Sequence, residues 1–426
     1  MKLPTLAIVT VLLASAAGCT SAAAHGSPGG NGRTLTIGMI NPFSGPDAEF
    51  GQEMAAGCIA AVQVINAHGG VLGNKLQCAV VDSKGDPADA VPAVAQALAT
   101  KGMAGVMGPG TDAATATVPM LNQAKIPTIG ANGDVSFDRS RYPYYWRILP
   151  SDDANGVAMA VAAHNLGYTR AALVFSSSPQ SQTFVPAILR AFPKLGGRIV
   201  ANESITPDQV SYQTEMAKVA AADPQVIFTE TDPQTGATMF SELKSLGKMF
   251  PILATGATTV PPWYQAVRHA IGLPDLLKFY HAVNEQTPTS GYSWQQFDHA
   301  LLAVRSVPDP GSHAISPFCE SYYDSANILA LAMIAAKSYS GPKYNQFLRT
   351  ITEPAPAATV VHTFPQGVAA LRAGKRIRYI GALGPIDFNK WHNSSGSFQV
   401  VRFAGNRATT TPITLISAEQ LQAASS

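Results

Sequence analysis

Short apolar segments alternate with segments of helical length from Thr34 to Gly256, and this alternation limits the fold more than any other feature of the sequence. The first series predicts strands over residues 34–40, 76–82, 104–108 and 126–131, and helices over residues 50–67, 88–100 and 113–123. Near-continuous apolar strands joined by helical crossovers are typical of parallel sheets that helices cover on both faces. The pattern therefore predicts an α/β fold with doubly wound parallel sheets.

A second series of the same kind begins after the segment YYWRILPSDD, residues 144–153. It predicts helices over residues 155–166, 184–195, 211–221 and 235–246, and strands over residues 170–176, 197–204, 224–231 and 250–256. A chain of 426 residues exceeds the roughly 250–300 residues that one hydrophobic core usually serves. We therefore expect two similar α/β lobes in tandem.

The last third of the chain has a different pattern. Residues 261–317 are Pro-rich, and we interpret them as irregular. A long helix follows over residues 320–338, and the chain closes with β-like segments at residues 378–389, 398–405 and 409–417.

The loops after the strands are the expected place for a ligand, because ligands of open α/β sheets collect at the carboxyl ends of the strands. In the first lobe these loops cover residues 41–51, 108–112 and 130–134, and in the second lobe they cover residues 175–184, 229–235 and 255–259. The sequence thus predicts which loops form the binding site but does not identify the ligand.

Charge and motif content exclude several classes of function. Charged residues are 13% of the chain and the formal net charge is +2, so no strong field is available to hold nucleic acid, and a small molecule is the expected ligand. The sequence contains no zinc-protease, P-loop or nucleophile-elbow motif, and its nine histidines show no pair at metal-ligand spacing. We therefore expect neither a catalytic residue nor a metal nor a cofactor.

The N-terminus reads as an export signal. Lys2 precedes the apolar segment LAIVTVLLASAAG, which is shorter than the about 20 residues of a membrane-spanning helix but suits a signal peptide over residues 1–18. The segment from Ala16 to Cys19 resembles a bacterial lipobox, which implies a lipid on Cys19. Residues 19–33 would then be a flexible tether, on a protein anchored by lipid to the extracytoplasmic face of the cell membrane. Ordinary signal cleavage with an incidental cysteine is the alternative.

Three further cysteines follow Cys19. Cys58 falls on the apolar face of the first helix and Cys78 on the next strand, so a helix packed on its own sheet could bring the two together. Export permits such a disulfide, and two separate buried thiols are the alternative. Cys319 is left over and we expect it to be inert.

The glycine turn at Gly108 and Gly110, with Ala113 after it, fits the loose fingerprint of dinucleotide-binding turns, and Asp134 follows at a plausible distance. An exported nicotinamide-dependent oxidoreductase is therefore an alternative. Export counts against it, because soluble nicotinamide cofactors are cytoplasmic.

Several segments resemble a known family. Residues 37–87 contain the Ser44-Gly45 turn, the segment INAHGGVLG and a strand that ends at Asp82. This combination resembles the opening of the leucine/isoleucine/valine-binding class of ABC-transporter substrate-binding proteins. The resemblance continues through residues 105–129, 144–156 and 320–332.

The resemblance implies a type I periplasmic-binding-protein fold, in which two lobes joined by three crossover strands close on a ligand. Lobe 1 would comprise residues 34–149 and 279–396, and lobe 2 residues 150–278 and 397–426. The implied function is capture of a small molecule, an amino acid or a related polar or aromatic compound, and its delivery by a monomer to an ABC permease with its ATPase. A ligand sensor of the same fold without a transport role is the alternative.

The resemblance also implies ligand contacts. Phe50 matches an aromatic residue of the side-chain pocket, and Phe184 is a possible match for a ligand-stacking tyrosine, although both could be core aromatics. A grip on the substrate carboxylate would come from residues 110–112 and 131–132, that is Gly110, Thr111, Asp112, Ala131 and Asn132. Asp232 lies in a further contact loop, and Gly256 stands near the position where the family's glutamate would grip the α-ammonium.

Two of these positions depart from the family pattern. Asp112 stands where a serine would donate to the carboxylate, and an ionised aspartate would repel it. Gly256 offers no partner for an ammonium, which costs several kcal/mol when it is buried unpaired. We therefore expect a ligand other than a plain branched-chain amino acid, with an amide, a polyol, an aromatic compound or a cation open, and with Asp112, Glu230 or Asp232 as its acceptor.

Overall fold

The fold is seen in a computed structural model, which describes residues 32–45, 47–100, 102–286, 288–314, 316–406 and 408–425. The expected signal peptide, the lipidation site at Cys19 and the tether up to residue 31 lie outside the described residues. Among the described residues, no helix combines the length and the apolar composition that crossing a membrane requires.

The first sheet is parallel, with five strands among the described residues in the order β2-β1-β3-β4-β5. The strands are β1 (Thr34–Asn41), β2 (Lys75–Asp82), β3 (Met103–Met107), β4 (Thr128–Gly130) and β5 (Tyr145–Arg147). Every residue of β1 after Thr34 is buried, as expected of a strand that helices cover on both faces. The strand order reverses at β1, so the carboxyl ends of β1 and β3 flank the crevice where ligands of such sheets bind.

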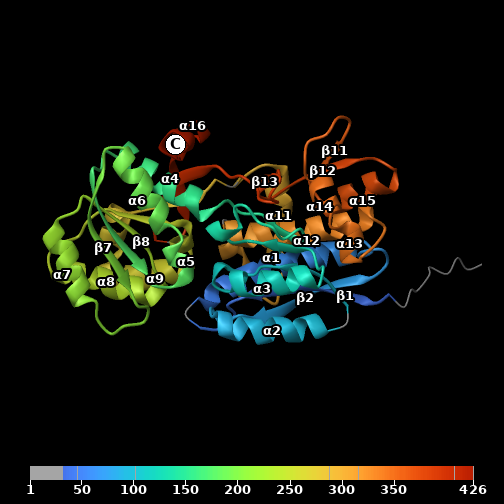
Figure 1. The fold of residues 1–426 in the computed structure, drawn as a ribbon, viewed down its shortest axis with the longest axis horizontal. Coiled ribbons are helices and arrows are strands. Elements are labelled where there is room, and N and C mark those ends of the chain that lie inside the picture. The colour runs from blue at the N-terminus through green and yellow to red at the C-terminus, as the bar shows by residue number, and fades with distance from the viewer. Residues whose placement is uncertain are drawn as a thin grey trace, which may run out of the picture. The chain divides into compact units, whose positions relative to one another are not determined.

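Helices from two distant parts of the chain cover this sheet. α1 (Ala48–Ala67), α2 (Pro87–Ala99) and α3 (Thr111–Gln123) belong to its crossovers, and α12 (Pro317–Ala335) returns to pack against α1. In Figure 1 the orange α12 lies beside the blue α1. Cys58 of α1 is joined to Cys78 of β2 by a disulfide with 6.3 Å between the Cα atoms, and Cys319 is a buried free thiol.

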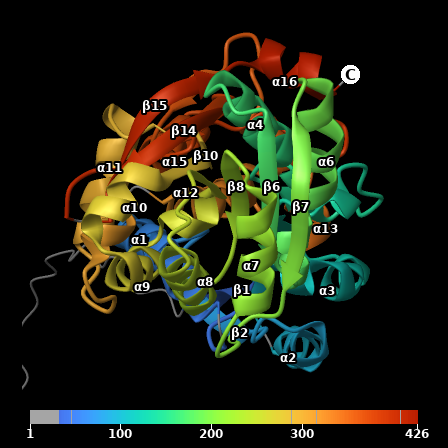
Figure 2. The same ribbon diagram turned by 90° about the vertical axis from the view of Figure 1, so that its left-hand side faces the viewer.

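The second sheet has seven strands among the described residues, in the order β15-β14-β10-β9-β8-β6-β7. They are β6 (Arg170–Ser176), β7 (Arg198–Ile205), β8 (Val226–Glu230), β9 (Ile252–Thr255), β10 (Tyr280–Glu285), β14 (Phe398–Phe403) and β15 (Thr410–Ile416). The strands from β6 to β10 are parallel, whereas β14 and β15 form an antiparallel edge. Figure 2 shows β15 and β14 on one side of this sheet and β7 on the other. The second part of lobe 1 was expected to begin at residue 279, whereas β10, at residues 280–285, pairs with β9 and belongs to the second sheet.

A second group of helices covers this sheet and forms the connections between its strands. They are α4 (Asp152–Asn165), α5 (Pro179–Gln182), α6 (Val185–Lys194), α7 (Gln213–Ala222), α8 (Pro233–Ser245) and α16 (Ala418–Ser425), with the 3-10 turn η2 (Gly256–Thr259) after β9. α4 packs on α6 and α16. The helices and strands expected up to Gly256 are all present, with ends that differ by up to three residues.

The prediction that residues 261–317 are irregular is wrong. The segment forms α9 (Pro261–Ile271), α10 (Leu273–Phe279), β10, α11 (Tyr292–Leu302) and the 3-10 turn η3 (Pro310–His313). Prolines stand in the first positions of α9, α10 and η3. A proline there removes an N–H that has no partner inside the helix, so it starts a helix rather than breaking one.

Further short elements complete the fold. The sequence did not predict η1 (Val135–Phe137), α13 (Gly341–Tyr344), α14 (Phe347–Thr350), α15 (Phe364–Arg372) or β11 (Thr359–Val361). β11 forms a small sheet with β12 (Ile377–Gly381) and β13 (Gly384–Pro385), and these two strands fall on the β-like segment expected at residues 378–389. Within the described chain, the connection between the two large sheets is made three times, after β5, after β10 and before β14.

Candidate ligand-binding cleft

One cavity of about 60 Å³ is lined by the carboxyl ends of strands from both large sheets. Asn41 ends β1, and residues 110–112 and 131–133 follow β3 and β4. From the second sheet come Glu230, Thr255 and Glu285, at the ends of β8, β9 and β10. An adjoining cavity of about 220 Å³ shares four of the lining residues, which are Phe50, Gln180, Glu230 and Ala257. We call the two together the cleft.

The structure brings the residues expected to bind ligand into this cleft. Eight of the nine line the smaller cavity, and they are Phe50, Gly110, Thr111, Asp112, Ala131, Asn132, Phe184 and Gly256. The ninth, Asp232, lines the adjoining cavity. The family-based placement of these side chains around one space is therefore geometrically consistent, and their contact with a ligand stays a prediction.

The N-terminus of α3 forms one wall. Gly110 is its N-cap, and its N–H donates to the Ile40 carbonyl at 3.3 Å, so this N–H is already used inside the protein. Asp112 is only 6% exposed, and its Oδ2 accepts a hydrogen bond from the Ser83 hydroxyl at 2.9 Å. Its Oδ1 has no hydrogen-bond partner among the described residues. Burial raises the pKa of the Asp112 carboxyl.

Asn132 holds its own loop in place. The Asn132 Nδ2 donates to the Pro109 carbonyl at 2.7 Å and to the Tyr145 hydroxyl at 2.8 Å, and its Oδ1 accepts from the Asp134 N–H at 3.2 Å. Both N–H groups of the amide are therefore used within the protein. In this arrangement Asn132 supports the wall and has no free donor for a carboxylate.

The opposite wall carries buried carboxyl groups from the second half of the chain. Glu230 Oε1 accepts from the Ser181 hydroxyl at 3.2 Å, and its Oε2 accepts from the Thr255 hydroxyl. Burial raises the pKa of Glu230 to about 7, against the opposing effect of these two hydroxyls. Burial also raises the pKa of Glu285.

Asp152 is a lining residue whose role the sequence interpretation missed. An acidic residue at a helix start ordinarily indicates a cap, but here Ser151 caps α4 through the Asp153 N–H, and Asp152 lines the cavity. Its Oδ2 accepts from the Thr183 hydroxyl at 2.7 Å, and burial raises its pKa well above the usual range. Glu285 was missed for a different reason, since it ends a strand within the segment that we had interpreted as irregular.

Apolar side chains complete the cavity. They are Phe50, Met54, Leu149, Phe184 and Phe318. Phe50 meets Phe318 edge to face with 5.5 Å between the ring centroids, and Phe184 stacks on Phe175 at 6.5 Å. Phe50 and Phe184 are 7% and 6% exposed, so both also belong to the packed core, and the two interpretations of these rings do not exclude each other.

Among the described residues that line the smaller cavity, none is a lysine, an arginine or a histidine. The buried Arg147 lies on β5 and its guanidinium pairs with Asp138 at 2.5 Å while donating to the Asp134 carbonyl at 2.8 Å. Lys84 lines the adjoining cavity and pairs with Asp89 at 3.3 Å. The cleft is therefore rich in hydrogen-bond acceptors and poor in positive charge.

Acidic residues also line the adjoining cavity. Asp232 caps α8, since its Oδ1 accepts from the Thr235 N–H at 2.9 Å. Its Oδ2 has no hydrogen-bond partner among the described residues. Burial raises the pKa of Asp47, which lines the same space, to about 6, and the Asp232 charge adds to this increase.

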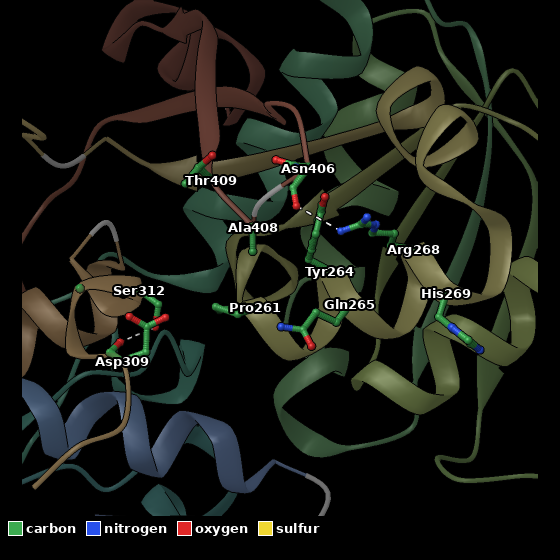
Figure 3. Close-up of a pocket in the computed structure, with 11 residues that line it drawn as sticks. Pro261, Tyr264, Gln265, Arg268, His269, Asp309, Ser312, Asn406, Ala408 and Thr409 are labelled. Carbon is green, nitrogen blue, oxygen red and sulfur yellow. Dashed lines mark hydrogen bonds between the residues drawn. The ribbon is translucent and has the colours of Figure 1, made fainter.

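A larger cavity lies elsewhere. It has a volume of about 1010 Å³ and is lined by α9, by residues 309, 311 and 312, and by residues 406, 408 and 409. Figure 3 shows Arg268 reaching toward Asn406, whose carbonyl accepts its hydrogen bond at 3.1 Å. This cavity shares no lining residue with the cleft and contains none of the expected site residues, so its size gives it no claim to be the site.

The glycine turn does not have the place of a dinucleotide-binding turn. Gly108 to Gly110 follow β3, whereas such a turn follows the first strand of its sheet, and the loop after β1 lacks the fingerprint. Within the described ranges there is no group of three or more His, Cys, Asp or Glu side chains that could hold a metal ion.

The fold and the cleft define a binding protein with two α/β lobes. A model of the family described as periplasmic binding protein matches residues 34–407, and the chain therefore belongs to this family. The family resemblance inferred from the sequence is confirmed, as is the fold class. Its relatives are solute-binding proteins and not enzymes, so the comparisons do not support the oxidoreductase alternative.

Similarities to individual proteins agree with this assignment. A Leu/Ile/Val-binding protein homolog of Brucella melitensis is 26% identical over 222 residues, which are 51% of this chain and 60% of that protein. The leucine binding protein LivK of Thermotoga maritima has a TM-score of 0.72 at 18% identity, covering 90% of this chain and 99% of that one. A solute-binding protein of R. palustris in complex with benzoate has a TM-score of 0.71 at 18% identity, covering 90% and 96%.

Proposed function

We propose that the protein is the solute-binding component of an ABC transporter, which captures a small molecule in the cleft without a chemical step. The observation that carries this proposal is the shared cavity, because the carboxyl ends of strands from two separate sheets line one space. Relatives are named for the amino acids leucine, isoleucine and valine, and one structural neighbour is a solute-binding protein in complex with benzoate, which supports an amino acid or a related polar or aromatic compound as the solute.

Binding would act through the two halves of the cleft. A solute that touches Asp112 of one wall and Glu230 of the other makes all its contacts only when the lobes are closed. Its higher affinity for the closed state then shifts the population toward that state. The three connections between the sheets would act as the hinge, with residues 145–150 as one of them.

Delivery would take place at the membrane surface. Lipidation of Cys19 would anchor the protein to the extracytoplasmic face, and residues 19–33 would let it reach its permease and ATPase partners. The proposed unit is a monomer that touches the membrane only through its lipid and binds no nucleic acid.

A thermal-shift screen of the purified protein tests the binding function. The panel contains amino acids, amides, polyols, polyamines, amines and aromatic acids, since a ligand at about a hundred times its Kd adds about 2.7 kcal/mol to the stability. We expect at least one compound to raise Tm, and Phe50→Ala to weaken that shift by enlarging the cavity. A panel without any hit, or a hit that binds Phe50→Ala and Thr111→Val as well as the unchanged protein, contradicts the proposal.

A further inference from the structure

The structure assigns an organic ammonium to this cleft, that is, a protonated amine with an apolar substituent and no free carboxylate. This inference rests on the proposed function and names its solute class. It starts from the signs of the charges that face the smaller cavity, and each step below uses a separate property of that space.

Four carboxyl groups from four different elements surround the cavity. Asp112 belongs to α3, Asp152 to α4, Glu230 ends β8 and Glu285 ends β10. Among the described lining residues there is no basic side chain to balance them. A buried carboxylate without a cation is unfavourable, so a positively charged solute supplies the partner that the protein itself does not provide.

Three of the lining side chains present acceptor oxygens that nothing in the described chain satisfies. Asn41 is 1% exposed, Asp112 is 6% exposed and Asn155 is 5% exposed, and the Oδ1 atom of each has no hydrogen-bond partner among the described residues. A primary ammonium carries three N–H donors and no acceptor. It therefore fits oxygens of this kind, whereas a carboxylate brings only further acceptors.

Several hydroxyl donors around the cleft are already in use, and among the described hydroxyls that line the smaller cavity Thr111 is the exception. Ser83 donates to Asp112, Thr183 to Asp152, and Ser181 and Thr255 to Glu230. The amide N–H groups of Asn132 are used inside its own loop. These side-chain donors are thus committed to the protein's own oxygens, which leaves a ligand carboxylate without them.

The N-terminus of α3 would ordinarily attract an anion. Here the protein places its own carboxyl group at that end, because Asp112 lies in the first turn of α3. A Cβ atom built on the neighbouring Gly110 would lie 2.6 Å from Asp112 Oδ1, so this oxygen closely approaches the helix start. A zwitterionic amino acid would have to bring its carboxylate to the same place.

The titration of these groups agrees with a cleft that lacks a cation. Burial raises the pKa of Asp112, Asp152, Glu230 and Glu285. The charges that act on them are acidic in the main, with Asp47 acting on Glu230, and with Glu230 and Glu285 acting on Asp152. Arg147 opposes the increase at Asp152 but is paired with Asp138.

The remaining surface of the cavity fits the apolar substituent. Phe50 and Phe318 meet on one side, and Phe184 comes from the start of α6, which follows β6 of the second sheet. Aromatic faces also attract ammonium groups directly. The cleft thus offers carboxyl oxygens for the cationic end of an amine and rings for its carbon skeleton.

The test uses two sets of probes that share a carbon skeleton and differ in charge. The first set is 3-methylbutylamine, leucine and 4-methylpentanoate, and the second is 2-phenylethylamine, phenylalanine and 3-phenylpropanoate. Calorimetric titration of the purified protein at pH 8 measures each affinity. We expect one amine to bind about tenfold or more tightly than its zwitterion, and its acid not to bind, because like charges repel in a buried site.

Variants locate the binding group. Glu230→Gln and Asp112→Asn keep the shape of each side chain, and each should weaken amine binding by about tenfold or more, since a buried charge pair loses one partner. Glu419→Gln makes the same change at an exposed glutamate of α16 and should leave the affinity unchanged. Amine binding should also weaken at pH 5.5, where the raised pKa of Glu230, about 7, leaves this group protonated.

The outcomes separate this inference from the proposed function. If leucine, phenylalanine or either acid binds more tightly than its amine, the inference is wrong and the proposed function stands. The inference is equally overturned if neither amine binds, or if Glu230→Gln and Asp112→Asn leave amine binding unchanged. Failure of every compound in the wider thermal-shift panel would overturn both.

Discussion

The Ser83 hydroxyl donates a hydrogen bond to Asp112 Oδ2 at 2.9 Å, and the other carboxyl oxygen of Asp112 is left without a partner at the wall of the cleft. Ser83 follows β2 and Asp112 begins α3, so the bond joins the ends of two crossovers of the first sheet. This hydrogen bond holds the Asp112 carboxyl group in the wall of the cleft, where it would repel the carboxylate of a ligand.

Replacement of Ser83 by alanine should lower the free energy of unfolding by about 1–3 kcal/mol, because a buried acceptor loses its donor. The loss should be larger at pH 8 than at pH 5, since the ionised form of Asp112 depends on the bond more than the protonated form. Urea denaturation at both pH values measures it. The matched control is Ser177→Ala at an exposed serine after β6, and an equal effect of the two variants would contradict the prediction.

The ligand-free protein should lose stability as the pH rises, through Glu230. Its pKa is raised to about 7 from the ordinary value of 4.5, so the folded state holds a proton that the unfolded chain has released. The stability from this proton is complete below pH 4.5 and is lost as the pH rises to about 7, a difference of about 3 kcal/mol.

Glu230→Gln should remove that part of the pH dependence, and the exposed Glu419→Gln should retain it. Free energies of unfolding at pH 5 and pH 8 compare the three proteins. Parallel changes in all of them would show that Glu230 titrates normally in the folded state.

Gly256 and Asn284 should be energetically coupled. A Cβ atom at Gly256 would lie 2.4 Å from Asn284 Oδ1, and Asn284 is 5% exposed, so the space for a side chain at this position is already filled. Gly256→Ala should therefore cost about 1–3 kcal/mol of stability. In a double-mutant cycle the cost should fall in the Asn284→Ala background; strictly additive effects would refute the steric explanation.

The disulfide between Cys58 and Cys78 should contribute about 3 kcal/mol for a loop of this length, with a sequence separation of 20. The double variant Cys58→Ala and Cys78→Ala should show this loss in denaturant unfolding. Added reductant should lower the Tm of the unchanged protein and leave that of the variant as it was. If reductant affects both proteins equally, the stabilisation does not come from this bond.

The alternating strands and helices could be predicted from the sequence because strands of a parallel sheet that are buried on both faces consist of uninterrupted apolar residues. β1 and β6 are examples, since nearly every residue in them is buried. The same reasoning failed for the segment after residue 260. We interpreted its proline content as irregular structure, but Pro261 and Pro274 lie at helix starts, where proline is favoured, and the composition does not show where a proline lies relative to a helix end.

The site was predictable only as far as the strand ends were. Phe50 and Thr111 come together because each follows a strand that the sequence located, and strand ends of one sheet share an edge. Gly256 follows a strand that the sequence also located, β9 of the second sheet. Asp152 begins α4 on the connection after β5, and Glu285 ends β10 just before the next connection. Their approach to the cleft depends on how the lobes pack, for which a single sequence carries no local pattern.

Because the chain passes between the two sheets three times, the first sheet is synthesised completely before the second sheet has all its strands. The second sheet gains its first strand at residue 170 and its last two only at residues 398–416, after all of the first sheet has been made. A chain that emerges from its N-terminus therefore presents β10 as an open edge until those strands arrive, and an open edge pairs readily with other chains. Neither lobe can be produced as one continuous fragment, and a nascent chain that stalls near residue 390 has a finished first sheet beside an unfinished second one.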